Sequence, residues 1–165
     1  MINRGVKNGA RNVKTDSTAC DRQLIISKLQ YFLSLKPEIV FGYLFGSQAT
    51  GCAGRLSDVD LAVYIDPSFR PPPGSYGYQS ELIAELSAFL GTTVEVVLLN
   101  NASIRLKHQV LKNGVLIHSR SHHERRSFHE RTIREYLDFK PLMKTQHEYM
   151  QKRILAFTFG CEENG

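Results

Sequence analysis

The sequence lacks the features that mark several classes of protein. Its 165 residues hold only three cysteines, and Cys20, Cys52 and Cys161 are widely spaced with no C-x-x-C pair. This spacing argues against a disulfide framework or a zinc site and favours a reduced environment. No apolar run approaches the roughly 18 residues that cross a bilayer, and residues 1–20 lack the apolar core of a signal peptide. We therefore expect a cytoplasmic protein with no membrane-spanning segment.

Acidic residues are outnumbered by basic ones, although only mildly. The chain has 21 Lys and Arg against 16 Asp and Glu, which gives a formal net charge of +5. The excess gathers in residues 1–22 and in the run HSRSHHERRSFHERTIR (118–134). Such patches suit an anionic partner, but charge runs and the histidines within them more often form a solvated helix face. We expect no direct binding to nucleic acid.

The length predicts one domain whose own apolar core is sufficient to hold it together. We divide the chain into a flexible N-terminal extension (1–20), a core (21–119), a C-terminal helical segment of the same domain (120–159) and a tail (160–165). Apolar residues at helical spacing predict a first helix from about Asp21 that stops before Pro37. Further helices are predicted up to Gly91, over 102–112, and from 121 to 159 with a candidate break at Pro141.

Short apolar runs between these helices predict the strands of a small sheet. They are EIVFGYLFG (38–46), DVDLAVYID (58–66), TTVEVVLLN (92–100) and VLIH (115–118). In the second run Val59, Leu61, Val63 and Ile65 share one face, and the other face carries Asp58, Asp60, Ala62 and Tyr64. The order of elements predicts an α/β or α+β domain with a small mixed sheet flanked by helices.

Carboxylates interrupt two of these predicted strands. Asp58 and Asp60 are two positions apart, so their side chains point the same way, with Cα atoms roughly 6.5–7 Å apart. Two like charges on one face repel each other and are costly to desolvate, and a divalent cation would compensate them. Glu95 sits within the apolar run TVEVVLL and is a third candidate ligand. Oxygen ligands of this kind suit Mg²⁺ or Mn²⁺.

Gly46 and Ser47 supply the second half of a candidate site. A strand that ends in Gly-Ser and turns into a short helix (SQATG) offers N–H groups and a hydroxyl to an anion. The dipeptide gains weight from its spacing, because ten residues separate it from Asp58-Val59-Asp60. This is the G-S-x10-D-x-D signature, and from about Leu24 to Ile154 the sequence resembles the minimal nucleotidyltransferase (MNT) antitoxins of the DNA polymerase β superfamily, which pair with HEPN-domain toxins.

The resemblance implies a polymerase β-like fold and two-metal transfer of AMP from ATP to a tyrosine of a cognate HEPN RNase toxin. It implies that Gly46 and Ser47 hold the β- and γ-phosphates, that Asp58 and Asp60 bind two Mg²⁺ ions, and that Glu95 is the third acid. Many relatives read G-S-x-A-R-G where this chain has GSQATG, so Thr50 replaces an arginine and Arg55 is the candidate substitute. The third acid is more often Asp, and Glu95 reaches one methylene further.

Two other functions remain open from the sequence. The chain could transfer a nucleotide to a small hydroxylated molecule, although related enzymes of that kind carry a larger substrate domain. It could also neutralise its partner by contact alone, without catalysis, because a fold does not establish an activity. The helical segment after residue 121 is expected to pack on the sheet and to form part of the toxin interface.

Overall fold

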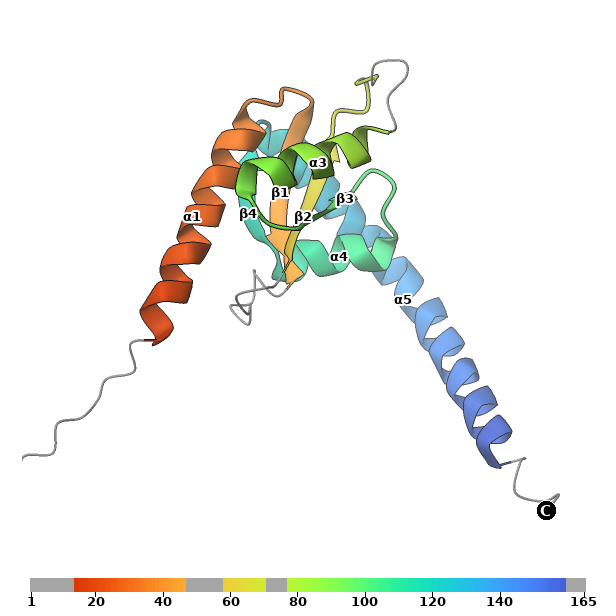
Figure 1. Cartoon of the computed structure of the whole chain (residues 1–165). Helices are drawn as coiled ribbons and strands as arrows, with labels where there is room; N and C mark the ends of the chain where they lie inside the picture. Colours follow the sequence, from red (N-terminus) through yellow and green to blue (C-terminus); the bar gives the residue numbers. More distant parts are fainter. Residues whose placement is uncertain (1–13, 47–57, 71–76, 160–165) are drawn as a thin grey trace, which may run out of the picture.

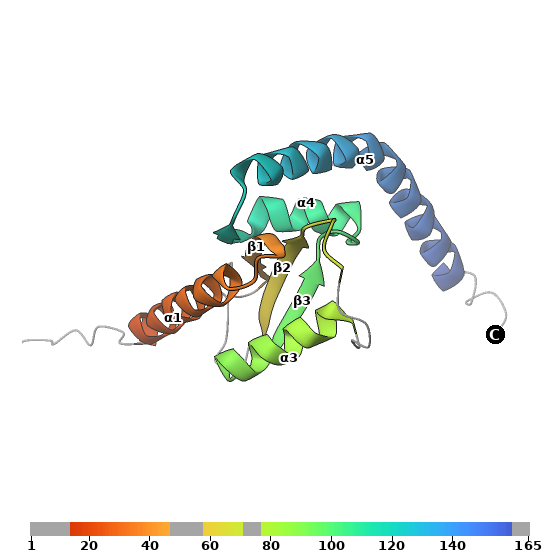
Figure 2. The same ribbon diagram turned by 90° about the horizontal axis from the view of Figure 1, so that it is seen from above.

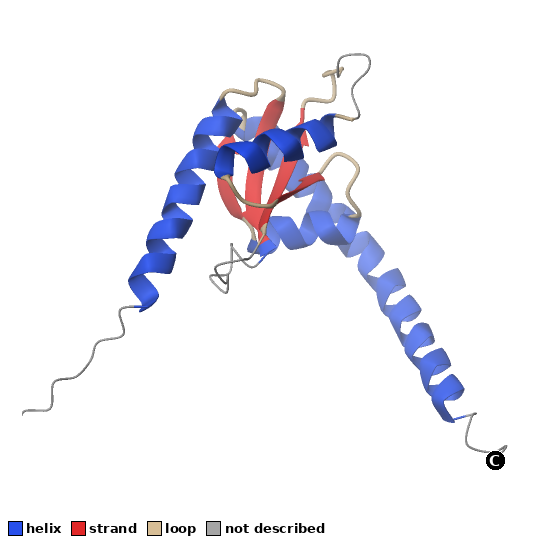
Figure 3. Cartoon of the chain, in the orientation of Figure 1, coloured by secondary structure: helices blue, strands red, loops and turns tan. Residues whose placement is uncertain are grey.

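The computed structural model describes residues 14–46, 58–70 and 77–159, and it contains a four-stranded mixed sheet. The strands lie in the order β3-β2-β1-β4 (Figures 1 and 3). Their bounds are Ile39–Phe45 for β1, Val59–Ile65 for β2, Val94–Leu98 for β3 and Val115–Ser119 for β4. β1 runs antiparallel to β2 and β4, whereas β2 and β3 are parallel. The predicted small mixed sheet is confirmed.

Helices cover both faces of this sheet. The helices of the described residues are α1 (Lys14–Ser34), α3 (Tyr78–Leu90), α4 (Ile104–Asn113) and α5 (His122–Phe159). Figure 2 shows α3 and α1 on one side of the sheet and α4 and α5 on the other, with α5 lying outside α4. No helix in the described parts of the chain combines the length and the apolar character needed to span a bilayer.

The two faces predicted for β2 contribute side chains to two separate hydrophobic clusters. Leu61 and Val63 are fully buried in the cluster that includes Leu33 of α1 and Leu86 of α3. Ala62 belongs to the opposite cluster, which also contains Val110 of α4. Because successive side chains of a strand point to opposite faces, both faces of β2 are covered. The strand that carries Asp60 is therefore held from both sides.

Stacked aromatic side chains join the sheet to the first half of α5. The ring of Phe41 in β1 stacks on Tyr64 of β2 with centroids 4.9 Å apart. Phe128 of α5 lies over both, at 5.3 Å from Phe41 and 4.9 Å from Tyr64. Phe128 and Thr132 are buried, as expected for a helix face that packs on the sheet.

Two helices differ from the sequence prediction at particular points. α1 begins at Lys14 and not near Asp21, so the helix continues into a polar stretch without an apolar period. α5 continues through Pro141 and is not broken there. Proline removes one intrahelical hydrogen bond and crowds the preceding turn, which bends a helix without ending it. Figure 2 shows that α5 changes direction along its length. The end of α3 at Gly91, in the left-handed conformation, is as predicted.

Candidate active site

The predicted acidic residues meet at one edge of the sheet. Because β2 is antiparallel to β1 and parallel to β3, the end of β1 and the beginnings of β2 and β3 lie together. Asp60 is paired with Phe45 on one side and with Glu95 on the other. Asp58 comes directly before β2, and Gly46 directly after β1. The fold thus brings Gly46, Asp58, Asp60 and Glu95 to one place.

Backbone hydrogen bonds fix this edge. The Val59 N–H, between the two aspartates, donates to the Thr93 carbonyl oxygen at 3.0 Å, which holds the beginning of β2 beside the beginning of β3. At the opposite end of β2 the side-chain amide of Asn100 donates to the Ile65 carbonyl oxygen at 2.8 Å and accepts from the Ile65 N–H at 2.9 Å. The Asn100 side chain therefore makes the two hydrogen bonds with Ile65 that the backbone of a neighbouring strand would otherwise make. Sequence reasoning missed it, although an Asn directly after an apolar run was the available signal.

The carboxylates differ in burial and influence one another. Asp58 and Glu95 are exposed, whereas Asp60 is half-buried. Burial is the main cause that raises the pKa of Asp60, and the negative charges of Glu95 and Asp58 raise it further. The ionised form of Asp60 is thus less favourable here than in water. This edge of the sheet holds negative charge that a bound cation would stabilise.

Gly46 has a steric reason to be glycine in addition to its predicted contact with phosphate. Its φ angle is +69°, in the left-handed region that side chains rarely adopt. A Cβ atom built on Gly46 would overlap the Asp60 carboxylate. The backbone of the turn therefore approaches the carboxylate more closely than any other residue type would allow.

The remaining predicted nucleotide-binding residues, Ser47 and Arg55, lie outside the described residues, as do Thr50 and the short helix expected after Ser47. Their roles stay predictions. His118, His122, His123 and His129 form no metal-binding group with other described residues. Burial lowers the pKa of His118, so its neutral form is favoured.

The acidic edge suits a divalent cation by its chemistry, although it is not a completed metal centre. Among the described residues no three acidic, histidine or cysteine side chains are arranged closely enough to hold an ion. Asp58, Asp60 and Glu95 nevertheless offer only carboxylate oxygens, the ligands that Mg²⁺ and Mn²⁺ prefer. Burial, together with the negative charges of Glu95 and Asp58, raises the pKa of Asp60, and a bound cation would favour its ionised form. The three carboxylates therefore remain the predicted ligands.

Solved structures with a similar fold include chains from toxin–antitoxin pairs. One is a toxin–antitoxin with AMP-PNP, at 25% identity and a TM-score of 0.66, covering 76% of this chain and 98% of that one. A mutant of the toxin–antitoxin MntA-HpeT matches at 25% identity and a TM-score of 0.61, covering 78% and 96%. A chain in the structure of tri-AMPylated Shewanella oneidensis HEPN toxin in complex with MNT antitoxin matches in fold, at 22% identity and a TM-score of 0.59, covering 81% and 98%.

A comparison of sequences identifies the family of this chain. No curated protein sequence matches this chain significantly. The family profile described as Polymerase beta, Nucleotidyltransferase matches residues 27–123. This range includes all four strands and the carboxylates at their edge. Since the match extends over more than half of its length, the chain belongs to the polymerase β nucleotidyltransferase family.

Proposed function

We propose that this protein is an antitoxin that transfers AMP from ATP to a tyrosine of a cognate HEPN toxin. The observation that carries the proposal is the pairing of Asp60 with Glu95 beside Gly46, at a sheet edge where negative charges repel one another. Burial and the neighbouring negative charges make ionised Asp60 costly, and a cationic ligand would offset this cost. The raised pKa of Asp60 is typical of a functional site.

The chemistry that fits this edge is an in-line displacement at phosphorus. The acceptor hydroxyl oxygen forms a bond to the α-phosphorus of ATP, the bond from that phosphorus to the bridging oxygen breaks, and pyrophosphate leaves. Asp58 and Asp60 would hold Mg²⁺, or Mn²⁺ in its place, and the bound ions would stabilise the charge that develops on the phosphate oxygens. Glu95, which is exposed at the edge, would be the third acidic ligand and would help one ion to activate the acceptor hydroxyl, whose proton passes to solvent. Gly46, Ser47 and Arg55 would position the phosphates.

The choice of a protein acceptor rests on the structures of similar fold. One of them contains AMP-PNP, and another contains a HEPN toxin that carries three AMP groups together with its MNT antitoxin. A HEPN protein encoded beside this chain would be the natural acceptor. The cytoplasm, where ATP and such a toxin occur together, is the compartment that fits this activity.

Mass spectrometry of the partner tests the proposal directly. The purified protein is incubated with ATP, Mg²⁺ and the cognate HEPN protein, and the mass of the partner is measured. We expect a gain of one or more AMP groups on a tyrosine. No gain in mass would refute the transfer, and omission of Mg²⁺ should abolish it.

Isosteric variants separate catalysis from contact. The double substitution Asp58→Asn with Asp60→Asn keeps the side-chain size and removes the charge, and we expect transfer to fall at least about 100-fold. If the folded variant still neutralised the toxin fully in cells, neutralisation by contact would replace our proposal. Transfer to a small hydroxylated compound but not to the HEPN protein would favour the second alternative.

A further inference from the structure

A groove of about 500 Å³ lies between α4 and α5, and its lining contains none of the residues of the candidate active site. We call it the α4–α5 groove. Its basic lining residues are Arg105 of α4 and Lys140 and Lys144 of α5. Tyr136, Met143 and Met150 of α5 supply most of its apolar surface. A groove of this size accommodates several side chains of a partner.

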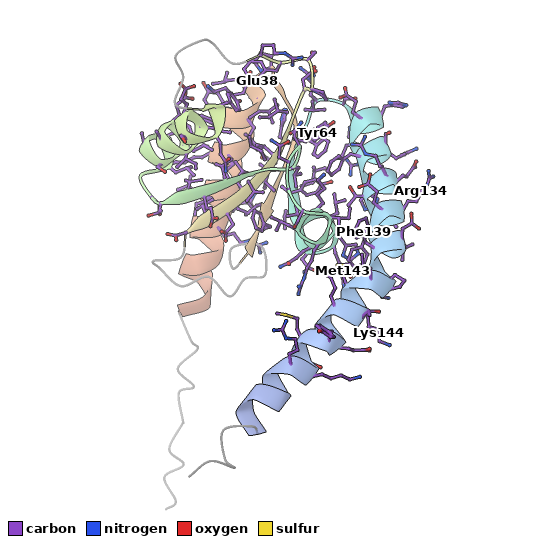
Figure 4. All side chains as sticks on the ribbon, turned by 90° about the vertical axis from the view of Figure 1, so that its right-hand side faces the viewer. Glu38, Tyr64, Arg134, Phe139, Met143 and Lys144 are labelled. Atoms are coloured by element: carbon purple, nitrogen blue, oxygen red, sulfur yellow. The ribbon has the colours of Figure 1, made fainter. Side chains whose placement is uncertain are left out.

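Stacked rings form part of the inner wall of the groove. The ring of Tyr136 stacks on His108 of α4 with centroids 3.7 Å apart and planes inclined by only 4°. Figure 4 shows Met143 between α4, which is seen end-on, and α5. Tyr136 and Met143 are half-buried, whereas Met150 is 59% exposed. Methionine side chains adapt to irregular apolar surfaces and are common where proteins bind one another.

The described charged residues of the groove have one sign. Arg105, Lys140 and Lys144 are exposed, and no carboxylate is among the described residues that line the groove. Lys144 does have an ion pair with Glu148, but at 3.8 Å between two exposed side chains this contact is weak. A partner surface that carries carboxylates beside apolar side chains would complement the groove.

The part of α5 that follows Pro141 exposes several large apolar side chains. Leu142, Tyr149 and Met150 are 52%, 63% and 59% exposed. Figures 1 and 2 show this end of α5 extending beyond the sheet and α4. Most of the stability of a helix in a protein comes from a packed apolar face, so a partner that covers these side chains would stabilise this end of α5.

We propose that the α4–α5 groove docks an acidic, partly apolar segment of the protein that accepts the nucleotide. This inference rests on the proposed function, since that function requires a protein acceptor. The groove would hold the partner while the acceptor hydroxyl reaches the edge of the sheet that carries Asp58, Asp60 and Glu95, which we call the carboxylate edge. Docking and chemistry then belong to separate sets of residues.

Charge reversal within the groove tests this role. We expect Lys140→Glu with Lys144→Glu to weaken binding of the purified cognate HEPN protein at least about tenfold. Its KM as acceptor should rise while kcat and the KM for ATP stay unchanged. The dependence of binding on salt should also become weaker, because fewer opposite charges meet.

The matched control reverses two charges on the same helix outside the groove. Arg126→Glu with Arg134→Glu changes the net charge equally, and Figure 4 shows Arg134 pointing away from α4. We expect this variant to bind like wild type, and thermal unfolding should show both variants folded. Equal loss of binding in both variants would indicate a general effect of charge and would contradict docking in the α4–α5 groove.

The other outcomes separate this inference from the proposed function. If wild type modifies the partner and the groove variant binds the partner as tightly as wild type does, docking in the groove is wrong and the proposed function stands. If wild type binds without transferring AMP and the groove variant loses binding, docking is right and the transfer is wrong. If wild type neither binds nor modifies the HEPN protein, both are wrong.

Discussion

Asp60 is the residue at which the effect of the candidate site on the stability of the fold can be measured. Burial and the charges of Glu95 and Asp58 raise its pKa. A carboxyl group whose pKa is higher in the folded state contributes stability below its ordinary pKa of 3.8 and loses it as the pH rises through the folded value. At neutral pH the ionised Asp60 therefore destabilises the fold.

The variant Asp60→Asn should consequently be more stable than wild type at pH 7 without divalent ions. The difference should shrink as the pH falls toward the ordinary pKa, because wild-type Asp60 then binds its proton. Thermal unfolding between pH 4 and pH 8 measures both effects. A variant that is less stable than wild type at pH 7 would contradict this account of the repulsion.

Divalent ions should reverse the order of stability. An ion that binds only the folded state raises its stability by mass action. We expect Mg²⁺ or Mn²⁺ to raise the melting temperature of wild type and to leave Asp60→Asn almost unchanged. The same shift in both proteins would place the ion elsewhere. The result needs neither ATP nor a partner, so it tests the predicted ligands independently of activity.

Gly46 offers a second test at the scale of one residue. Gly46→Ala would place a Cβ at a φ of +69° and against the Asp60 carboxylate. We expect a loss of about 1–3 kcal/mol in the free energy of unfolding from the backbone conformation alone. Gly91→Ala is the control, because Gly91 has a φ of +70° but open space around it. Equal losses in urea unfolding would show that contact with Asp60 adds nothing.

The aspartates and the two faces of β2 could be predicted from the sequence, because alternation along a strand is a local property. The pairing of Asp60 with Glu95 could not, since it depends on which strands become neighbours and in which register. The steric role of Gly46 was hidden for the same reason: Asp60 reaches it only through the pairing of β1 with β2.

Among the elements, α5 changes character along its length. Its first half is attached to the sheet by Phe128, which is 3% exposed and lies against Phe41 and Tyr64. Phe139, eleven residues further along the same helix, is 50% exposed. The periodicity of the sequence predicted helical faces along the whole segment but could not distinguish the buried beginning of α5 from its more exposed middle, because burial depends on what α4 and the sheet present to each face.

Alanine substitutions should show that the beginning of α5 contributes more to stability than its middle. Phe128→Ala removes a buried ring and should cost about 3–5 kcal/mol. Phe139→Ala removes an exposed ring and should change stability by less than about 0.5 kcal/mol. Urea unfolding of both variants provides the comparison. Similar losses would mean that α5 packs against the rest of the molecule at least as far as Phe139.

At the scale of the whole molecule, different helices cover the two faces of the sheet. α1 and α3 close one face, and α4 and α5 cover the other and form the α4–α5 groove. The groove joins residues of α4 to residues of α5 that are far apart in sequence, so no local pattern could predict it. Its basic residues could only be read from the sequence as solvated charges.

Removal of residues 141–165 should therefore leave the fold intact and abolish docking. Among the side chains whose burial the structure describes, the buried ones all precede Lys140, and the last is Thr132. We expect a melting temperature close to that of wild type and unchanged binding of AMP-PNP, because the carboxylate edge stays complete. Binding of the HEPN protein should be lost, since Met143, Lys144 and Met150 leave the groove.

A second truncation serves as the comparison. Removal of all residues after Ser121 also deletes Phe128 and Thr132, which are buried against the rest of the molecule, and should expose the core and cause unfolding. Circular dichroism and size-exclusion chromatography distinguish the two outcomes. A chain that ends at Lys140 and still binds its partner as tightly as wild type would move the docking surface away from this end of α5. It would leave the carboxylate edge and its proposed chemistry untouched, because the proposed docking involves α4 and α5, whereas the proposed chemistry involves residues at the ends of β1, β2 and β3.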